Sequence, residues 1–537
     1  MRSVIFPRKG NIPYRVLCFI YSRKIRSFER AARNPITAQE KVFRALIKQG
    51  KNTDFGRKYQ FSTIRTLEEY RKRVPVHHYD DFKPFVDRIV EGENKVLFSE
   101  KVTGFVETSG TSARAKLIPV TSSWAAHIQT AQILWIISLL KDFPQIAKGK
   151  TLRLLSSAQE RKTENGLSIG ANTGRMQDAL PKWLQGEPVF PAEISAISDQ
   201  EIKIYVRLRF ALQEPISSWT TANPSTILLY CRKLQEYKEA LGDDLVQGTL
   251  ENGPAQKLSP EIRAKLQPYL RQRPRPIDWH PAALWPLRVI NCWKGGPAHF
   301  FVQQLPDALG GDIPIRDVGI TASEGYFALP LSNNWNGGVL WTEGELLEFR
   351  DEEGMMHWAW ELEIGKQYQL VISTLMGLYR YDLRDIIEVT GFYQKTPIIR
   401  FVGKAGRFLN ATGEKVSEEQ FSQALQNTGA VIIGATAKTV WQEVPYIKVG
   451  IEAEDLPSDF EMMLERCLQE VNIEYAQKRK TGRLQPLQLV YFSEGTYQRY
   501  RKYRIGQGAS SAQVKDLLIA VREEEWADLL SCSQVSA

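Results

Sequence analysis

The chain has 537 residues, of which 43% are hydrophobic and 24% are charged, and it contains 13 tryptophans. This composition is typical of a folded globular protein and excludes a disordered chain, while the length predicts a large domain and at least one smaller one. The five cysteines and six histidines are scattered, which excludes a disulfide scaffold, a redox motif and a zinc site and favours a reducing, cytoplasmic compartment.

The positive charge is concentrated at the N-terminus. Residues 1–34 hold nine basic side chains against Glu29 alone, which leaves the rest of the chain nearly neutral although the net charge is +9. No nucleic-acid partner is therefore expected. Because apolar residues 16–21 lie within this basic arm, it could make a peripheral contact with an anionic membrane surface. The favoured alternative is a solvated helix face whose apolar stripe docks on the body of the protein.

The first part of the chain predicts helices and then a mixed α/β region. Residues 36–73 are typical of a helix, a loop at 52–56 and a second helix that ends before Pro75. Strands are expected on both sides of a Gly/Ser/Thr loop, and Thr121 or Ser122 caps a helix that runs to about Leu140. The predicted strands are 102–106, 117–120, 152–155, 287–292, 317–321, 339–340, 346–349, 368–374 and 398–402. The longest apolar run is too short to span a membrane.

A basic turn at 403–407 separates this region from a segment of different order. Here the pattern predicts helix, strand, strand, helix and strand, at 417–425, 431–436, 447–453, 459–477 and 487–492. Ser417 and Gln420 have the spacing of a capping box. We therefore predict an α/β protein with a large N-terminal domain of mixed β-sheets and helices and a small α+β C-terminal domain. The expected divisions are 1–34 for the basic arm, 35–402 for the large domain and 403–537 for the small one.

The first motif with chemical potential is residues 107–116, ETSGTSARAK. Its hydroxyls and exposed backbone N–H groups could surround phosphate oxygens, and Lys116 would add a positive charge. By itself such a cluster is more often an ordinary loop, and it does not fit the phosphate-loop pattern of NTPases. The residues concerned are Thr108, Ser109, Gly110, Thr111 and Ser112.

The second motif is residues 319–325, GITASEG, which follow a predicted strand. Glu324 at the end of that strand could hold a magnesium ion that bridges phosphates, because Mg²⁺ takes carboxylate oxygens and keeps several waters. The alternative is a surface carboxylate in a turn.

The third motif is residues 378–385, LYRYDLRD. Asp382 and Asp385 lie among Arg380 and Arg384, and a salt-bridged strand end is the favoured interpretation of this segment in isolation. Alternatively, one of these carboxylates could accept hydrogen bonds from ribose hydroxyls.

Taken together and in this order, the motifs resemble the adenylate-forming superfamily of acyl-CoA synthetases, luciferases and peptide-synthetase adenylation domains. The chain is more closely similar to the Gretchen Hagen acyl acid amido synthetases, the auxin-responsive family, especially in its bacterial form. The similarity extends over nearly the whole chain. The matching segments are 53–57, 74–76, 79–80, 91–93, 108–112, 116–121, 323–324, 378–381 and 413–415.

The resemblance implies an adenylate-forming ligase that uses ATP and Mg²⁺. Such an enzyme activates a small carboxylic acid as its acyl-AMP, releases pyrophosphate and passes the acyl group to an amine, expected to be an amino acid. It implies that residues 108–112 grip the ATP phosphates together with Lys116. It further implies that Asp385 holds the ribose and that Arg407 marks the hinge between domains. The residues that would flank adenine and phosphate are Thr321, Ala322, Ser323 and Glu324, the last also on Mg²⁺.

The family also has a mobile lysine near its C-terminus. Lys515 in the segment SAQVK is the candidate for the residue that moves in to stabilise the adenylation transition state, and Lys502 is the alternative. Lys116, Glu324 and Lys515 are thus the implied catalytic residues. The acid-binding residues are expected on the helix after Trp124.

Further acid-binding residues are expected around Arg207, Arg209 and Trp219, although a packing role or a surface position is an equal alternative for these residues.

The chain departs from the family pattern at four positions. Ala113 stands where the family usually has glycine, and alanine resists positive φ. Ile320 stands where a tyrosine is expected to stack on adenine, and Asp516 and Leu517 replace a Pro-Arg pair. These departures leave open a degenerate nucleotide-binding or scaffold protein. The wider resemblance also leaves open a thioester-forming ligase that uses coenzyme A.

Overall fold

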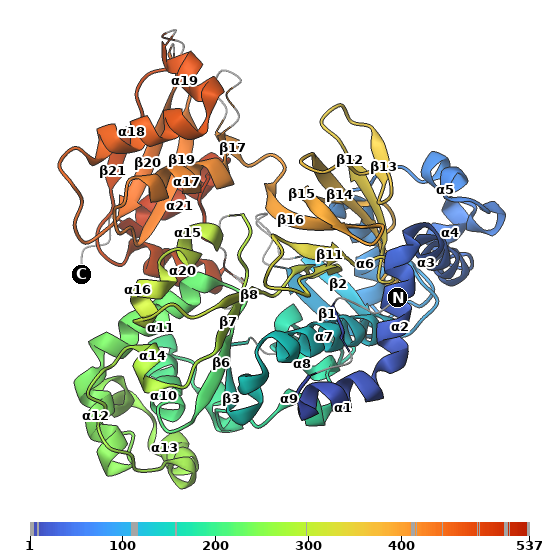
Figure 1. The fold of residues 1–537 in the computed structure, drawn as a ribbon. Helices are drawn as coiled ribbons and strands as arrows, with labels where there is room; N and C mark the ends of the chain where they lie inside the picture. Colours follow the sequence, from blue (N-terminus) through green and yellow to red (C-terminus); the bar gives the residue numbers. More distant parts are fainter. Residues whose placement is uncertain are drawn as a thin grey trace.

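The computed structural model arranges the chain in three bodies around a central cavity (Figure 1). An antiparallel sheet and the N-terminal helices lie on the right of the view, a parallel sheet lies below, and the C-terminal segment forms a separate body at the upper left. The structure describes residues 5–7, 10–108, 116–155, 158–296, 298–409, 414, 416–442, 444–480, 482, 484–507, 509, 514 and 516–533.

The basic arm forms two helices that dock on the body. The side chains of Tyr14, Leu17 and Phe28 are buried, and the buried carboxylate of Glu29 accepts a hydrogen bond from Tyr393 Oη at 2.8 Å. The docking alternative is therefore confirmed for the inward stripe of these helices. The N-terminal helices are α1 Ile12–Ile20, α2 Ser22–Arg33, α3 Pro35–Gly50, α4 Asp54–Lys58, α5 Leu67–Arg73 and α6 Tyr79–Val90.

The loop expected at 52–56 is partly helical. Thr53 Oγ1 accepts a hydrogen bond from Gly56 N at 3.0 Å and so caps α4, which begins at Asp54. A threonine oxygen at this position satisfies a backbone donor that the first helical turn leaves free.

A small mixed sheet follows, in the order β2-β1-β5-β4. Strands β1 and β2 are antiparallel, with Thr108 opposite Lys116, so residues 109–115 connect their adjacent ends. Helix α7 begins after Thr121, whose side chain accepts from Trp124 N, as the sequence predicted. The elements of this part are β1 Val102–Thr108, β2 Lys116–Thr121, α7 Ser122–Asp142, β4 Arg161–Lys162, β5 Ser168–Gly170, α8 Asn172–Ala179 and α9 Lys182–Gln185.

The second sheet is parallel, in the order β3-β6-β7-β8, and the carboxyl ends of its strands meet at one edge. Crevices at such edges are where open α/β sheets bind ligands. The strands are β3 Lys150–Arg153, β6 Ile216–Thr220, β7 Val289–Cys292 and β8 Ile315–Asp317. The helices around them are α10 Gln200–Ala211, α11 Pro224–Glu236, α12 Lys238–Gln247, α13 Pro260–Leu266, α14 Pro281–Leu284, α15 Ala298–Val302 and α16 Leu305–Leu309.

The expectation of cavity-lining positions around Arg207 and Arg209 is wrong, whereas Ser218 and Thr220 beside Trp219 do line the cavity. Arg209 and Trp219 are fully buried in the core beside the parallel sheet, and neither they nor Arg207 line the cavity. The packing alternative therefore holds, because the helix that carries the arginines covers the sheet away from the crevice.

The third sheet has eight antiparallel strands in the order β13-β12-β14-β15-β16-β11-β10-β9. The strand predicted at 317–321 is divided between two sheets, because Gly319 has φ +98° and a Cβ atom there would lie 2.5 Å from the Ala328 carbonyl oxygen. The strands are β9 Ile320–Ala322, β10 Gly325–Leu329, β11 Gly338–Leu340, β12 Leu346–Arg350, β13 Met356–Trp358, β14 Gln367–Ser373, β15 Tyr381–Tyr393 and β16 Thr396–Lys404.

The C-terminal segment has its own hydrophobic core, to which Phe301 of α15 also contributes. The predicted order of elements and the capping box of Ser417 and Gln420 are confirmed. The helix expected at 459–477 divides at Asn472, whose side chain accepts from Tyr475 N at 2.7 Å. The elements are β17 Phe408–Leu409, β18 Val416–Ser417, α17 Glu418–Asn427, β19 Gly434–Val440, β20 Tyr446–Glu452, α18 Phe460–Val471, α19 Ile473–Lys480, β21 Gln488–Tyr491, α20 Thr496–Gly506 and α21 Glu523–Ser533.

The predicted fold class is confirmed: mixed sheets and helices form a large N-terminal part, and a smaller α+β part follows. The residue boundaries of the domains remain a prediction. Short 3₁₀ helices link the elements at η1 Phe61–Thr63, η2 Pro144–Lys148, η3 Ala192–Ala196, η4 Gly253–Lys257 and η5 Gln267–Tyr269.

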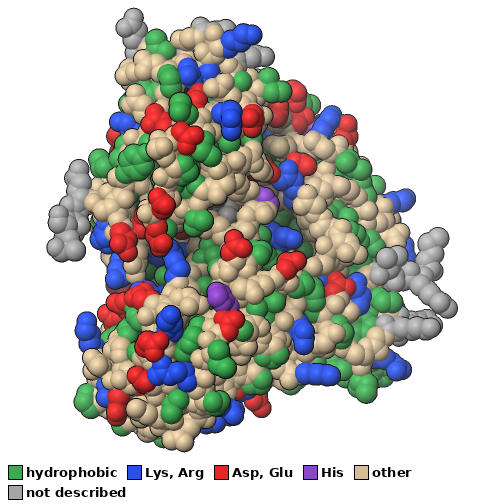
Figure 2. Space-filling model, turned by 60° about the vertical axis from the view of Figure 1, so that its left-hand side comes forward, with side chains coloured by type: hydrophobic (Ala, Val, Ile, Leu, Met, Phe, Trp, Pro, Cys, Tyr) green, Lys and Arg blue, Asp and Glu red, His purple; other side chains and the backbone are tan. Residues whose placement is uncertain are grey.

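The outer surface agrees with the charge distribution in the sequence. On the face shown in Figure 2, acidic and basic side chains are interspersed without a large area of one sign. None of the described helices combines the length and the apolar character that a membrane crossing requires.

Candidate active site

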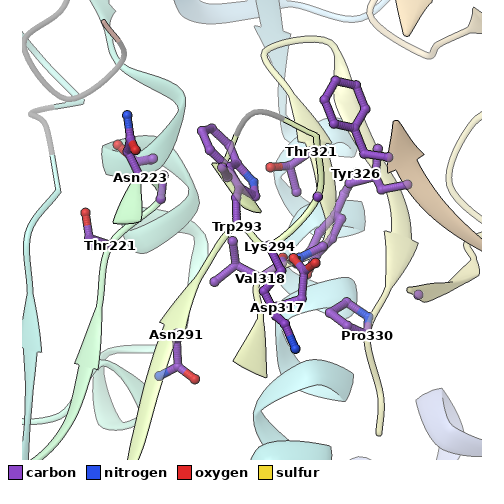
Figure 3. A pocket seen from close by; sticks show the side chains of 18 of the residues that line it. Thr221, Asn223, Asn291, Trp293, Lys294, Asp317, Val318, Thr321, Tyr326 and Pro330 are labelled. Carbon is purple, nitrogen blue, oxygen red and sulfur yellow. Dashed lines mark hydrogen bonds between the residues drawn. The ribbon is translucent and has the colours of Figure 1, made fainter. Parts of the chain in front are cut away.

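A cavity of about 1800 Å³ lies between the three bodies. Its walls include the carboxyl ends of the parallel strands, the β9–β10 turn and the ends of β15 and β16. Figure 3 shows Thr221 just after β6, Asn291 in β7 and Asp317 at the end of β8, with Trp293 and Thr321 nearby. A pocket for one small ligand usually measures about 300–1,000 Å³. The cavity therefore has room for a nucleotide and a second substrate together.

Lys116 enters the cavity from the start of β2 and is held by Tyr79. Tyr79 Oη donates to the Leu117 carbonyl oxygen at 3.0 Å and accepts from Leu117 N at 2.8 Å, which fixes the strand end. The Lys116 Nζ lies 5.2 Å from the centre of the Tyr79 ring, a cation–π distance. Burial lowers the pKa of Lys116, and the nearby Glu324 carboxylate acts in the opposite direction. The Lys116 ammonium group is therefore at a position where a bound anion would be stabilised.

The predicted phosphate loop falls largely outside the described residues. This applies to Ser109, Gly110, Thr111, Ser112 and Ala113, and nothing is described for the Thr108 side chain. The two strands that carry the loop nevertheless form the expected hairpin and end at the cavity, where Lys116 is a wall residue. A grip on phosphate by this loop remains a prediction.

Glu324 occupies the turn between β9 and β10. It is only 6% exposed, yet it forms no ion pair with any described residue. Burial raises the pKa of its carboxyl, while nearby Lys404 and Lys116 partly counteract this effect. A buried carboxylate without a fixed partner is suited to a cation that arrives with a ligand.

A second buried carboxyl lies directly behind this turn. Glu345 is 6% exposed, and a Cβ atom on Gly325 would lie 2.6 Å from its Oε1. Burial raises the pKa of Glu345 to about 8. Gly325 is therefore required for the close approach of the turn to Glu345.

Asp385 and Lys404 lie opposite each other on β15 and β16. Lys404 Nζ lies 2.5 Å from Asp385 Oδ1. Burial by itself lowers the pKa of Lys404, but the surrounding carboxylates of Asp385, Glu324 and Glu418 outweigh it and raise that pKa. The structure thus adds Lys404 to the site, which the sequence interpretation had placed only within a basic turn.

Two further residues of the third motif form buried ion pairs. Arg380 Nε lies 2.8 Å from Glu348 Oε2, and Arg350 Nη2 lies 2.6 Å from Asp382 Oδ2. The salt-bridge interpretation is therefore confirmed for Arg380 and Asp382, while Asp382, Arg384 and Asp385 all line the cavity.

The segment before Glu324 is fixed by hydrogen bonds to its backbone. Asn172 Nδ2 donates to the Ala322 carbonyl oxygen at 2.8 Å, and Tyr326 Oη donates to the Val318 carbonyl oxygen at 2.7 Å. Thr321, Ala322 and Ser323 all line the cavity, and so does Ile320. Ile320 also packs against the hydrophobic core. An aliphatic side chain therefore forms the cavity wall at the position where a tyrosine ring was expected to stack on adenine.

Arg407 connects the turn after β16 to the C-terminal segment. Its Nη2 lies 2.8 Å from Glu525 Oε1, and its Nη1 donates to the Ile519 carbonyl oxygen at 2.6 Å. The residue lines the cavity, but these partners occupy its guanidinium. Arg407 thus connects the two parts of the chain, as a residue at a hinge would. Its role as the hinge and its contact with the nucleotide both remain predictions.

Lys515 lies outside the described residues. Val514 and Asp516 on either side of it both line the cavity, so this part of the chain reaches the site. Lys502 is exposed and is not among the wall residues. Asn223 Nδ2 donates to Asp516 Oδ2 at 3.4 Å and joins the C-terminal part to the parallel-sheet part.

A magnesium site built by protein ligands alone is not present in the described part of the chain, where no three His, Cys, Asp or Glu side chains converge. Glu324 fits the alternative arrangement, in which one carboxylate holds Mg²⁺ together with substrate phosphates and water.

Comparison with known proteins gives consistent matches along the chain. Residues 24–315 match the GH3 family N-terminal domain, residues 341–404 its central domain and residues 419–523 its C-terminal domain. The chain is 24% identical to the indole-3-acetic acid-amido synthetase GH3.4 of Arabidopsis thaliana, over 92% of this chain and 90% of that protein. It is 25% identical to the indole-3-acetic acid-amido synthetase GH3.8 of Oryza sativa subsp. indica, over 92% and 89%.

Two solved structures share the fold. GH3.15 acyl acid amido synthetase gives a TM-score of 0.81 at 21% identity over 94% of both chains. The 2-hydroxyisobutyryl-CoA ligase gives a TM-score of 0.59 at 11% identity over 95% of this chain and 93% of that one. The first structure belongs to an amide-forming enzyme and the second to a thioester-forming one, so the fold by itself does not select the acyl acceptor.

Proposed function

The chain belongs to the GH3 family, and from this membership we propose that it is an ATP-dependent acyl acid amido synthetase. It activates a small carboxylic acid as its acyl-AMP with release of pyrophosphate, and then transfers the acyl group to an amine, an amino acid, to form an amide. One observation carries the proposal: Lys116, Glu324 and Asp385 come from three separate segments and line one cavity. The curated relatives are named as amido synthetases of indole-3-acetic acid, which supports the amide product.

In the first half-reaction, the carboxylate of the acid attacks the α-phosphorus of ATP and pyrophosphate leaves. Negative charge develops on the phosphate oxygens, and Lys116 lies where it offsets that charge. Because Tyr79 fixes the strand end at Leu117, the ammonium group is positioned before the reaction begins. Glu324 would hold Mg²⁺, which neutralises phosphate charge when bound.

Asp385 and Lys404 are proposed to hold the nucleotide. The Asp385 carboxylate can accept from the ribose hydroxyls, while Lys404 keeps that carboxylate ionised and in place. Lys404 Nζ also donates to the Leu383 carbonyl oxygen at 3.4 Å, so one of its three N–H groups remains for a phosphate oxygen.

In the second half-reaction, the nitrogen of the amine attacks the acyl carbon, the bond from that carbon to the AMP oxygen breaks, and the nitrogen loses a proton. No covalent enzyme intermediate is needed. The C-terminal part would change its orientation between the two steps, with the turn around Arg407 as the hinge.

Lys515 is proposed to serve the first half-reaction alone. Lys515→Ala should then block acyl-AMP synthesis but still convert supplied acyl-AMP to amide when the amine is present. Lys502→Ala is the matched control and should have normal rates in both assays. If Lys502→Ala loses adenylation and Lys515→Ala does not, the assignment of the lysine is wrong.

The function is tested by ATP–pyrophosphate exchange over a panel of carboxylic acids, followed by measurement of AMP release with amino acids or with coenzyme A. Acid-dependent exchange and amino-acid-dependent AMP release support an amido synthetase. AMP release that requires coenzyme A and yields a thioester identifies the rival ligase. ATP binding without exchange for any acid would instead indicate a scaffold protein.

We also propose that residues 1–34 make a peripheral contact with an anionic membrane surface, through the face of α1 that points away from the body. Arg15 of α1 and Arg23 and Arg26 of α2 are exposed and pair with no acidic side chain of the described residues. Basic side chains beside an apolar helix face favour such an interface.

A further inference from the structure

One part of the cavity, called here the apolar branch, has mainly apolar walls. It lies between α1, α7, α8 and α9, where apolar wall residues predominate, although Gln132, Asn172, Thr173 and Gln177 also line it and Arg153 of β3 adds a charged side chain. Arg153 Nη1 donates to the Gln185 carbonyl oxygen at 2.6 Å at the end of α9. Representative wall residues are Leu17, Ile136, Leu139, Met176, Leu180 and Leu184.

The inner end of this branch meets the site of adenylation. Asn172 of α8 donates to the Ala322 carbonyl oxygen at 2.8 Å, and Trp135 Nε1 of α7 donates to the Asp317 carbonyl oxygen at 3.0 Å. Both contacts fix the chain just before Glu324. An acid whose carboxylate is near Glu324 would therefore have its remaining atoms in the apolar branch.

The outer end of the branch reaches the protein surface beside α1. Val16 and Trp183 line the cavity and are also 48% and 57% exposed, so they belong to the wall and to the outer surface at once. The Trp183 ring stacks on Tyr21 at a centroid distance of 6.2 Å and an interplanar angle of 6°. Helices α1 and α9 lie side by side in Figure 1. The mouth of the branch is therefore located between Val16 and Trp183.

The outward face of α1 is apolar, and so is its inward face. Ile12, Val16, Phe19 and Ile20 are 77%, 48%, 83% and 50% exposed. Their spacing of four, seven and eight residues from the first places them on one stripe of the helix. A continuous exposed apolar stripe of this kind marks an interaction surface, unlike single exposed apolar residues.

We propose that α1 lies in the interface of an anionic lipid bilayer and that the apolar branch accepts a lipophilic carboxylic acid from that bilayer through the mouth between Val16 and Trp183. The inference rests on the proposed function and specifies its substrate class. The exposed arginines beside the stripe complement anionic headgroups, and the stripe itself would be buried among acyl chains. A lipophilic acid partitions into the same bilayer, so its entrance lies where its local concentration is highest.

The substrate class is tested by ATP–pyrophosphate exchange with straight-chain alkanoic acids of increasing length. Because each buried methylene stabilises binding, KM should fall about fourfold per added carbon until the branch is filled. Exchange that is confined to short or polar acids would overturn the inference and leave the proposed function intact. Exchange with no acid of any class would contradict the proposed function itself.

A charge in the wall gives a second test. Met176→Lys should raise KM for long acids by about tenfold or more, and should leave KM for the shortest active acid unchanged. Met463→Lys on α18 is the matched control and should change neither value. Equal effects of Met176→Lys on long and short acids would show that the branch does not hold the chain.

The lipid contact is tested with the double variant Ile12→Gln and Phe19→Gln, which changes no cavity residue. It should lose cosedimentation with phosphatidylglycerol vesicles and keep its exchange rate with a water-soluble acid. Met462→Gln with Ile473→Gln, two exposed apolar residues on the C-terminal part, is the matched control and should bind vesicles normally. Unchanged vesicle binding by the α1 variant, or equal binding of the parent protein to pure phosphatidylcholine, would contradict the assignment of α1.

Discussion

Lys404 Nζ lies 2.5 Å from Asp385 Oδ1, and the two residues face each other across β15 and β16 at the edge of the cavity. A lysine that holds a carboxylate in this way also carries positive charge toward Glu324, whose carboxyl it influences. The pair therefore links the proposed ribose-binding group to the proposed metal-binding group.

Lys404→Met should raise KM for ATP roughly tenfold, because a charge-assisted hydrogen bond contributes about 1.5–3 kcal/mol and 1.4 kcal/mol corresponds to a factor of ten. Asp385→Asn should have a similar effect, and the double variant should lose less than the two single variants combined, because the two residues also act as a pair. ATP titration of the exchange rate measures all three. Lys366→Met, which removes a surface lysine paired with Glu363, is the control. Fully additive losses would show that the two residues act independently.

Lys116→Met and Glu324→Gln should each reduce acyl-AMP formation by about 100- to 1,000-fold, with a smaller effect on ATP binding. Each removes charge stabilisation that is greatest in the transition state. Single-turnover formation of acyl-AMP gives the rate, and equilibrium binding of ATP gives the affinity. Lys83→Met, at an exposed ion pair with Asp87, controls for loss of a lysine. A normal single-turnover rate in either site variant would remove that residue from the catalytic group.

Glu345→Gln should stabilise the protein at alkaline pH. Burial raises the pKa of Glu345 to about 8, whereas a glutamate in an unfolded chain titrates near ~4.3. The folded state holds the proton more tightly, so the stability of the parent protein falls as the pH rises from about 4 through about 8. Glutamine does not titrate and avoids this loss.

Thermal unfolding across this pH range checks the prediction. The Tm of Glu345→Gln should match that of the parent in acid and exceed it by several degrees above pH 8. Glu352→Gln at an exposed position is the control. A Tm difference of the same size at every pH would exclude titration of Glu345 as its cause.

Gly406→Ala tests the hinge through backbone conformation alone. Gly406 has φ +87°, and no atom lies within 4 Å of a Cβ atom built there. Alanine would therefore destabilise the observed turn by about 1–2 kcal/mol without a steric clash. The two half-reactions should change by different factors, because they require different orientations of the C-terminal part.

Gly429→Ala is the matched control for this substitution. Gly429 has φ +71° and equally open surroundings, but it follows α17 and lies away from the hinge. Separate assays of acyl-AMP formation and of amide formation from supplied acyl-AMP give the two rates. Identical changes in both variants would assign the effect to general stability.

Sequence motifs predicted the parts of the site that depend on local order. Glu324 and Asp385 belong to short motifs that can be recognised in the sequence, and both residues line the cavity in the structure. Lys404 was missed because its role depends on strand register, which pairs it with a residue 19 positions earlier in the chain. Register of this kind is set by the whole sheet rather than by the residues beside the lysine.

Errors in the fold prediction have equally specific causes. The strand predicted at 317–321 contains the β-branched residues Val318, Ile320 and Thr321, but the positive φ of Gly319 divides it between two sheets. Cavity-lining positions were also expected around Arg209 and Trp219, but both side chains are fully buried in the core. Their complete burial results from packing between α10 and the parallel sheet, which sequence pattern alone does not show.

The order of the two half-reactions is tested most directly by a rapid-quench single turnover with α-labelled ATP and an active acid. Without an amine, labelled acyl-AMP should accumulate on the enzyme. Addition of amino acids should convert it to labelled AMP and an N-acyl amino acid, and coenzyme A should not. Label that appears as AMP only through a thioester, or acyl-AMP that never forms although ATP is bound, would contradict an acyl acid amido synthetase.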